Sequence, residues 1–226
     1  MFGWLRTGLM LAAVLILTRF IPFSSFFRNV NTLVHELSHA VAALVLRGSV
    51  MQIHLYPDQS GVTYTVFETG WRVIPIAAAG YAGASLFAVW LFALYARGSV
   101  KSGLAIIAVT AAAALALFIR NDYGMLWSAG FVLLTGIVLL LPGWVQKGYY
   151  LLIAFLCLVE ALVTPFILLY LSVVTPTEAG DAASLSQATA VPAFIWSLLF
   201  VLFSLWCARI ALNRLFVPRP SRAEQH

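Results

Sequence analysis

Charged residues and cysteine are scarce in this sequence. Only 9% of its 226 residues are Asp, Glu, Lys or Arg, whereas 62% are hydrophobic. Soluble globular domains carry about 25% charged residues, so this composition excludes them and indicates an integral membrane protein. The two cysteines, Cys157 and Cys207, lie in separate apolar runs without a C-x-x-C partner. A disulfide framework and a cysteine metal site are therefore not expected.

Long polar segments are also missing. Apolar runs that are long enough, or nearly long enough, to cross a bilayer recur along the chain, and no stretch between them could fold as a soluble domain. We therefore expect a single membrane-embedded domain over residues 1–226. Residues 1–27 are expected to be a retained N-terminal anchor, because the apolar run after Arg6 lacks a signal-peptide cleavage pattern. Residues 213–226 form a basic tail.

The hydrophobic pattern predicts an all-α polytopic membrane protein with about six to seven membrane helices. Residues 29–46 have helical character and end at an Arg-Gly pair, which is a plausible C-terminal cap. Residues 50–66 are rich in β-branched and aromatic residues around a Pro-Asp-Gln-Ser-Gly turn, which predicts a small β-hairpin. Further membrane helices are expected at residues 72–95, 103–119, 125–141, 149–173 and 191–212.

The net charge of +5 comes mostly from basic residues near the ends of the predicted helices. This placement indicates membrane topology and does not suggest a nucleic acid partner. Arginines gather at the C-terminal end, while the loop before the last helix carries only Glu178 and Asp181. The positive-inside rule therefore places the C-terminus in the cytoplasm.

Ionisable residues within apolar segments mark candidate sites, because a charge inside a bilayer is costly unless it is paired or bound. Residues 35–39, His-Glu-Leu-Ser-His, fit the pattern H-E-x-x-H. Helical residues four apart share a face, so His35 and His39 can bind one zinc ion. Glu36 then lies beside the metal, where it can act as the general base that activates a zinc-bound water. The pattern predicts a zinc peptidase.

Three segments together resemble the site-2 protease family of intramembrane zinc metallopeptidases, and more closely its small bacterial M50B-like branch. They are HELSHAVAALVLRGSV, IHLYPDQSGVTYT and AAAGYAGASLFAVWL, and the similarity continues through GDAASLSQATAVPAFIWSLL. The resemblance implies a helical core that carries zinc and hydrolyses a peptide bond within or next to the bilayer. It also implies a membrane-embedded protein or peptide substrate and a location in a bacterial cytoplasmic membrane.

In proteolytic members of that family, the third zinc ligand is an aspartate in a motif of the Asn-Pro-Asp-Gly kind. The sequence NDYG at residues 121–124 keeps the asparagine, the aspartate and the glycine but lacks the proline, so Asp122 is the expected third ligand. Its alternative role is to cap the following helix. Glu160, in the middle of an apolar helix, should face the bundle interior and pair with a basic or metal group. Asp181 is a further candidate ligand, although a helix cap is its simpler interpretation.

The hairpin and the overall function each leave an alternative open. An edge strand near the site could bind a substrate segment by β-addition, or the hairpin could simply cover the site. The same residue cluster could belong to a metal-binding membrane transport or scaffold protein without protease activity, because broken helices often line transport sites. A general base next to two histidines favours the enzyme. With a cytoplasmic C-terminus and six full spans after the first anchor, Arg28 is expected in the cytoplasm. The histidine helix then enters from that side, and zinc should lie between the cytoplasmic face and mid-bilayer.

Overall fold

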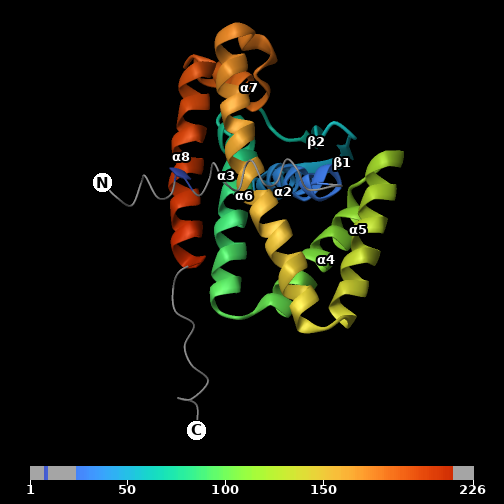
Figure 1. Ribbon diagram of the computed structural model, residues 1–226. Helices are drawn as coiled ribbons and strands as arrows, with labels where there is room; N and C mark the ends of the chain where they lie inside the picture. The colour runs from blue at the N-terminus through green and yellow to red at the C-terminus, as the bar shows by residue number, and fades with distance from the viewer. Residues whose placement is uncertain (1–7, 10–23, 216–226) are drawn as a thin grey trace.

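The computed structural model describes residues 8–9 and 24–215 (Figure 1). Most of the predicted N-terminal anchor and most of the basic tail therefore lie outside the described residues. The helices are α2 (Ser24–Val45), α3 (Val73–Ala96), α4 (Val100–Leu117), α5 (Asp122–Leu140), α6 (Gly143–Val174), α7 (Gly180–Thr189) and α8 (Ala193–Leu215), with a short 3₁₀ turn at Pro176–Glu178. The strands are β1 (Ser49–Leu55) and β2 (Gly61–Val66).

The predicted fold class is confirmed. Within the described residues, five helices are long and apolar enough to cross a membrane, namely α3, α4, α5, α6 and α8. They match the five later predicted helices within a few residues, except that α6 begins well before the predicted residue 149. Helix α2 is not among the five, because its apolar residues alternate with asparagines, histidines, a glutamate and an arginine.

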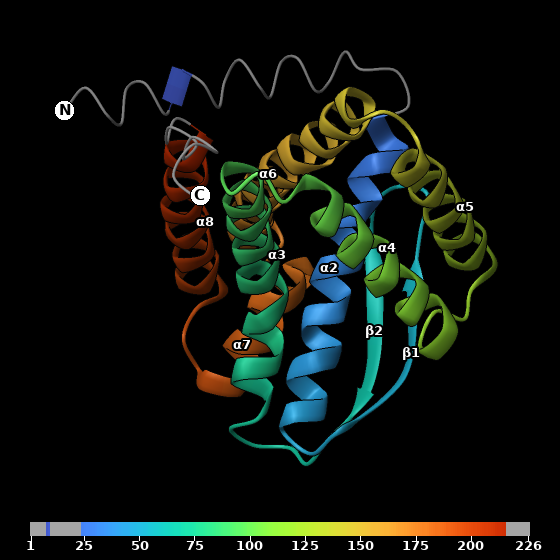
Figure 2. The ribbon, with the colours of Figure 1, turned by 90° about the horizontal axis from the view of Figure 1, so that it is seen from below.

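Helix α2 lies between α3 and the hairpin, as Figure 2 shows. Two glycines of α3 allow the close approach of α2 and α3. A Cβ atom added to Gly83 would lie 2.6 Å from the Cβ of Ser38, and one added to Gly80 would lie 2.5 Å from Nε2 of His35. Small residues allow helices to pack at short distance in membranes. This contact therefore brings the histidine face of α2 directly against the backbone of α3.

The predicted hairpin is confirmed, and its two strands have different surroundings. β1 pairs with β2 on one side and with the α4–α5 junction on the other, where the Ile53 N–H donates to the Phe118 carbonyl (2.8 Å). The side-chain amide of Asn121 accepts from the Leu55 N–H (3.1 Å) and donates to its carbonyl (2.6 Å). β2 pairs with no other strand in the described part of the chain. It is the edge strand.

The polarity of β2 is the reverse of that in a soluble hairpin. Gly61, Thr63 and Thr65 alternate with exposed residues and face the protein. The side chains of Val62, Tyr64 and Val66 are 40%, 42% and 56% exposed. A strand with polar residues inside and apolar residues outside suits a polar cavity on one side and lipid on the other.

An ion pair between the part-buried Arg28 and the buried Glu160 connects α2 with α6. The Arg28 guanidinium donates from Nε to Glu160 Oε1 (2.6 Å) and from Nη2 to Glu160 Oε2 (3.1 Å). Glu160 thus faces the bundle interior and pairs with a basic group, as its position in the sequence predicts. Removing one partner of a buried pair leaves an uncompensated charge, whereas replacing both by apolar residues can be neutral.

We expect Glu160→Gln to lower the free energy of unfolding by about 3–5 kcal/mol, because Arg28 would remain part-buried without a counter-ion. The double variant Arg28→Met/Glu160→Met should recover most of that loss. Denaturant or thermal unfolding of the purified protein in detergent measures both. A single variant that is as stable as wild type would show that the pair does not hold α2 against α6.

Candidate metal centre

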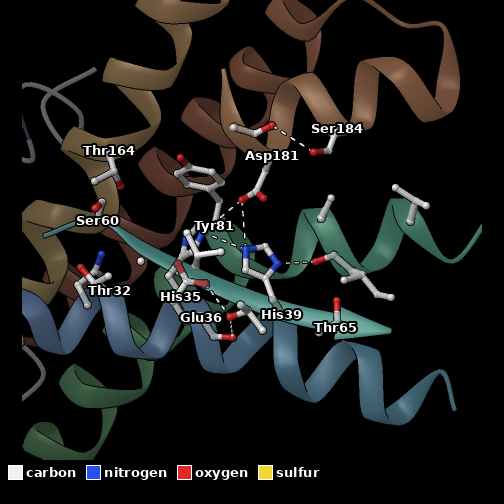
Figure 3. Close-up of a pocket in the computed structure, with 18 of the residues that line it drawn as sticks. Thr32, His35, Glu36, His39, Ser60, Thr65, Tyr81, Thr164, Asp181 and Ser184 are labelled. Atoms are coloured by element: carbon white, nitrogen blue, oxygen red, sulfur yellow. Dashed lines mark hydrogen bonds and ion pairs between the residues drawn. The ribbon is translucent and has the colours of Figure 1, made fainter. Parts of the chain in front are cut away.

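Three side chains converge on one point beside the cavity wall drawn in Figure 3. Asp181 Oδ2 lies 3.2 Å from Nε2 of His35 and 3.2 Å from Nε2 of His39, and the two Nε2 atoms are 3.0 Å apart. One ligand atom from each residue lies within 4.8 Å of the others. These residues come from α2 and α7, which are far apart in the sequence.

This donor set fits zinc. Two donors bonded to a tetrahedral zinc ion at about 2.0–2.2 Å lie about 3.3–3.6 Å apart, so the three atoms would need to separate by only a few tenths of an ångström. Nδ1 of His39 lies 2.7 Å from the carbonyl oxygen of Ile76. An N–H at Nδ1 donates to that carbonyl and leaves the Nε2 lone pair free to face the other donors, an orientation typical of metal-binding histidines.

The ring of His35 is fixed by aromatic packing. Its centroid lies 4.7 Å from the centroid of the Tyr81 ring in an edge-to-face arrangement, and Tyr81 in turn stacks on Phe200 at 4.9 Å. The same ring of His35 contacts the backbone of Gly80. Both imidazoles are therefore oriented by α3, His39 by a carbonyl and His35 by a tyrosine.

Asp181 reaches the histidines because the chain folds back after α6. The short turn at Pro176–Glu178 ends the long helix, and α7 then starts at Gly180, whose φ of +41° suits glycine. Ala182 and Leu185 of α7 are fully buried. Burial raises the pKa of Asp181, but the interactions of its carboxylate with His35 and His39 outweigh burial and hold the pKa below its usual range.

The structure does not bring Asp122 to the histidines, which corrects the expected ligand set. Asp122 is the exposed first residue of α5 and lies outside the group formed by His35, His39 and Asp181. The reason is that Asn121, its neighbour, binds the backbone of β1 and fixes this segment at the far edge of the hairpin. Asp122 is not the N-cap either, because Asn121 holds that position.

Glu36 lies directly against the edge strand of the hairpin. Its Oε2 accepts a hydrogen bond from the Thr63 hydroxyl (2.6 Å). A Cβ atom added to Gly61 would lie 2.6 Å from its Oε1. Glu36 is only 5% exposed, so strand β2 contacts both oxygens of a buried carboxylate and fixes its orientation. Sequence reasoning missed Thr63 and Gly61, although their alternation in GVTYT could have placed them on one strand face.

A cavity of about 510 Å³ opens beside these residues. Its wall is formed by α2, by the hairpin from Gln59 to Phe67, by the start of α3, by α6 at Thr164 and by α7. Many of its side chains are polar, among them Asn31, Thr32, Ser60, Thr63, Thr65 and Ser184. His54 and Asp58 of the hairpin are not part of this wall. Such a lining can hold the water that hydrolysis requires.

A model of the family described as Peptidase M50B-like matches residues 7–211. The chain belongs to this family. Searches of curated proteins and of solved structures found no match. Family membership, together with the five apolar helices, supports a membrane metalloprotease, and it confirms the resemblance seen in the sequence.

The position of the cavity along the bundle differs from the expected one. The cavity is lined by Val73, Ile76 and Tyr81 in the first half of α3, and by α7. Figure 1 shows the C-terminal end of α8 at the opposite end of the bundle from α7. If the five apolar helices cross a membrane, a site in the cytoplasmic half and a cytoplasmic C-terminus exclude each other. The expected depth of the site assumed that α2 is a full span, and α2 is not among the five helices that are long and apolar enough to cross a membrane.

Gly80→Ala should abolish metal binding, because the new Cβ would lie within 2.5 Å of Nε2 of His35 and displace the ring. Gly136→Ala is the matched control, since a Cβ there meets nothing within 4 Å. We expect about one zinc ion per wild-type chain and per Gly136→Ala chain by elemental analysis. Gly80→Ala and the double variant His35→Ala/His39→Ala should bind none. Full occupancy in Gly80→Ala would contradict the arrangement described here.

Proposed function

We propose that this protein is an intramembrane zinc metallopeptidase that hydrolyses a peptide bond within or next to the bilayer. The observation that carries the proposal is the convergence of three metal-type donors beside a buried glutamate and a polar cavity. His35, His39 and Asp181 would hold the zinc ion. The substrate would be a membrane-embedded protein or peptide.

The bound zinc ion would polarise the scissile carbonyl and lower the pKa of the attacking water. Glu36 would take a proton from that water and later deliver it to the amine leaving group. The hydrogen bond from Thr63 would keep one carboxylate oxygen of Glu36 occupied, so that the other oxygen accepts the proton. The polar cavity would supply water to a site that lipid would otherwise keep dry.

The hairpin is suited to hold the substrate. β2 has a free edge in the described part of the chain, and several of its residues line the cavity next to Glu36. An extended substrate segment could add to this edge by backbone hydrogen bonds. Binding of that kind would unwind a transmembrane helix, whose peptide bonds are otherwise protected by helical hydrogen bonding.

We also propose that the C-terminus is cytoplasmic in a bacterial inner membrane. Arg97, Lys101, Lys147 and Arg214 lie at or near the helix ends that share the C-terminal side of the bundle (Figure 1). The site would then lie in the outer half of the membrane. We favour the peptidase over a transport or scaffold role, because the buried glutamate beside the donors can act as the general base in hydrolysis.

Glu36→Gln should retain zinc and lose proteolysis, because Gln cannot accept the proton from water. Comparison of membrane proteomes from cells that carry the wild-type or the Glu36→Gln protein tests this. At least one membrane protein should accumulate at full length only in the variant, and its fragments should appear only in the wild type. Identical proteomes with equal zinc content would favour the non-proteolytic alternative.

Ser184→Cys and Ser102→Cys test the orientation as a matched pair, in a background where Cys157 and Cys207 are alanine. Both serines are exposed, Ser184 on the cavity wall and Ser102 in the first turn of α4. In cells with a permeable outer membrane, a membrane-impermeant maleimide should label position 184. Position 102 should react only after the inner membrane is opened. The reverse pattern would overturn the proposed orientation.

A further inference from the structure

One polar side chain in the cavity wall has no partner. Asn31 is 5% exposed and lines the cavity, yet its Oδ1 is fully buried without a hydrogen bond. No hydrogen bond of its side-chain amide to any described residue is present. Buried amides are nearly always hydrogen-bonded in native proteins, so an unpaired one requires an explanation.

Neighbouring polar residues of the wall are satisfied. The Thr32 hydroxyl donates to the carbonyl of Gln59 (2.9 Å), and the Thr164 hydroxyl donates to the carbonyl of Glu160 (2.7 Å). Asn29, two residues before Asn31 on the same helix but outside the wall, donates from Nδ2 to the Tyr123 hydroxyl (2.6 Å), while its Oδ1 also lacks a partner. Among the described side-chain oxygens that are buried without a partner, that of Asn31 is the one that belongs to a residue of the cavity wall.

The position of Asn31 relates it to the metal centre. Asn31, His35 and His39 follow one another at intervals of four residues, so they lie on the same face of α2. Asn31 is one helical turn, about 6 Å along the axis, from His35. Extended chain covers about 3.3 Å per residue, so a peptide that is cleaved at the metal and runs along α2 reaches Asn31 after about two residues.

We propose that the Asn31 side chain binds the main chain of the peptide substrate about two residues from the scissile bond. A peptide group offers one donor and one acceptor, and rotation of the asparagine amide can turn either its nitrogen or its oxygen toward the cavity, so Asn31 can donate to a peptide carbonyl or accept from a peptide N–H. The partner that Asn31 lacks in the described structure is then supplied by the substrate. This inference rests on the proposed peptidase function, and it adds a residue that recognises peptide backbone without regard to sequence.

The variant Asn31→Leu tests the proposal, because leucine has the same branching but no hydrogen-bonding groups. The probes are acetohydroxamate, which binds only a metal, and two apolar tripeptide hydroxamates that extend from the zinc-binding group to either side of the scissile position. We expect one tripeptide hydroxamate to bind about tenfold more weakly to Asn31→Leu than to wild type. The affinity for acetohydroxamate and the zinc content should not change.

The melting temperature provides a second measurement, because the proposed role of Asn31 and a purely structural role predict changes of opposite sign. Removing an unpaired buried amide should leave the melting temperature of Asn31→Leu equal to that of wild type or raise it by about 2–4 °C. The matched control is Asn29→Leu, which would leave the Tyr123 hydroxyl unpaired. It should lower the melting temperature and leave all three hydroxamate affinities unchanged. Asn31→Ala serves as a smaller variant and should weaken the same tripeptide probe.

Three outcomes would overturn the proposal. In the first, Asn31→Leu and Asn31→Ala bind both tripeptide hydroxamates as tightly as wild type. In the second, the two variants lose as much affinity for acetohydroxamate as for the tripeptide probe. In the third, both variants melt below wild type, as Asn29→Leu does. Failure of the proposed function looks different. In that case, wild-type protein would bind neither zinc nor any hydroxamate, irrespective of the residue at position 31.

Discussion

The constraint on which this structure depends is that polar groups inside a bilayer need partners. The charged groups of α2, α6 and α7 that lie inside the described core each have one. Arg28 pairs with Glu160, Glu36 accepts from Thr63, and the two histidines share Asp181. These contacts link α2 to α6, to the hairpin and to α7 in turn. The polar residues therefore act both as the chemical groups of the site and as the contacts that hold a marginally apolar helix among strongly apolar ones.

The close approach of the α2 and α3 backbones is the second feature on which the site depends. The glycines of α3 that face α2 let the histidine rings lie directly on the backbone of a neighbouring helix. A carbonyl of α3 then orients His39, and a tyrosine of α3 packs on His35. The metal-type donors thus come from α2 and α7, while their orientation is set by α3. Rigid helices on three sides hold the donor atoms more accurately than loops could.

Much of the fold and part of the site follow from the sequence. Hydrophobic runs locate the five apolar helices, turn residues locate the hairpin, and helical spacing places His35 and His39 on one face. These are local patterns, in which a few neighbouring residues carry the signal. The third donor is different. Asp181 and Asp122 both stand near the start of a helix, and nothing within either segment tells which one folds back toward α2. That choice depends on contacts between residues far apart in the chain. These contacts are the packing of the buried face of α7 and the hydrogen bond between Asn121 and the backbone of β1.

The late position of Asp181 has a consequence for biosynthesis. Four long helices, α3 to α6, separate the histidines from their carboxylate partner, and α7 is anchored partly by α8, the last helix. A nascent chain therefore carries the H-E-x-x-H helix into the membrane long before the three donors can meet. A hydrolytic centre of the proposed kind would therefore be complete only after the chain has been synthesised through α7. The order of segments along the chain would thus keep the proposed peptidase inactive until most of the molecule has been made.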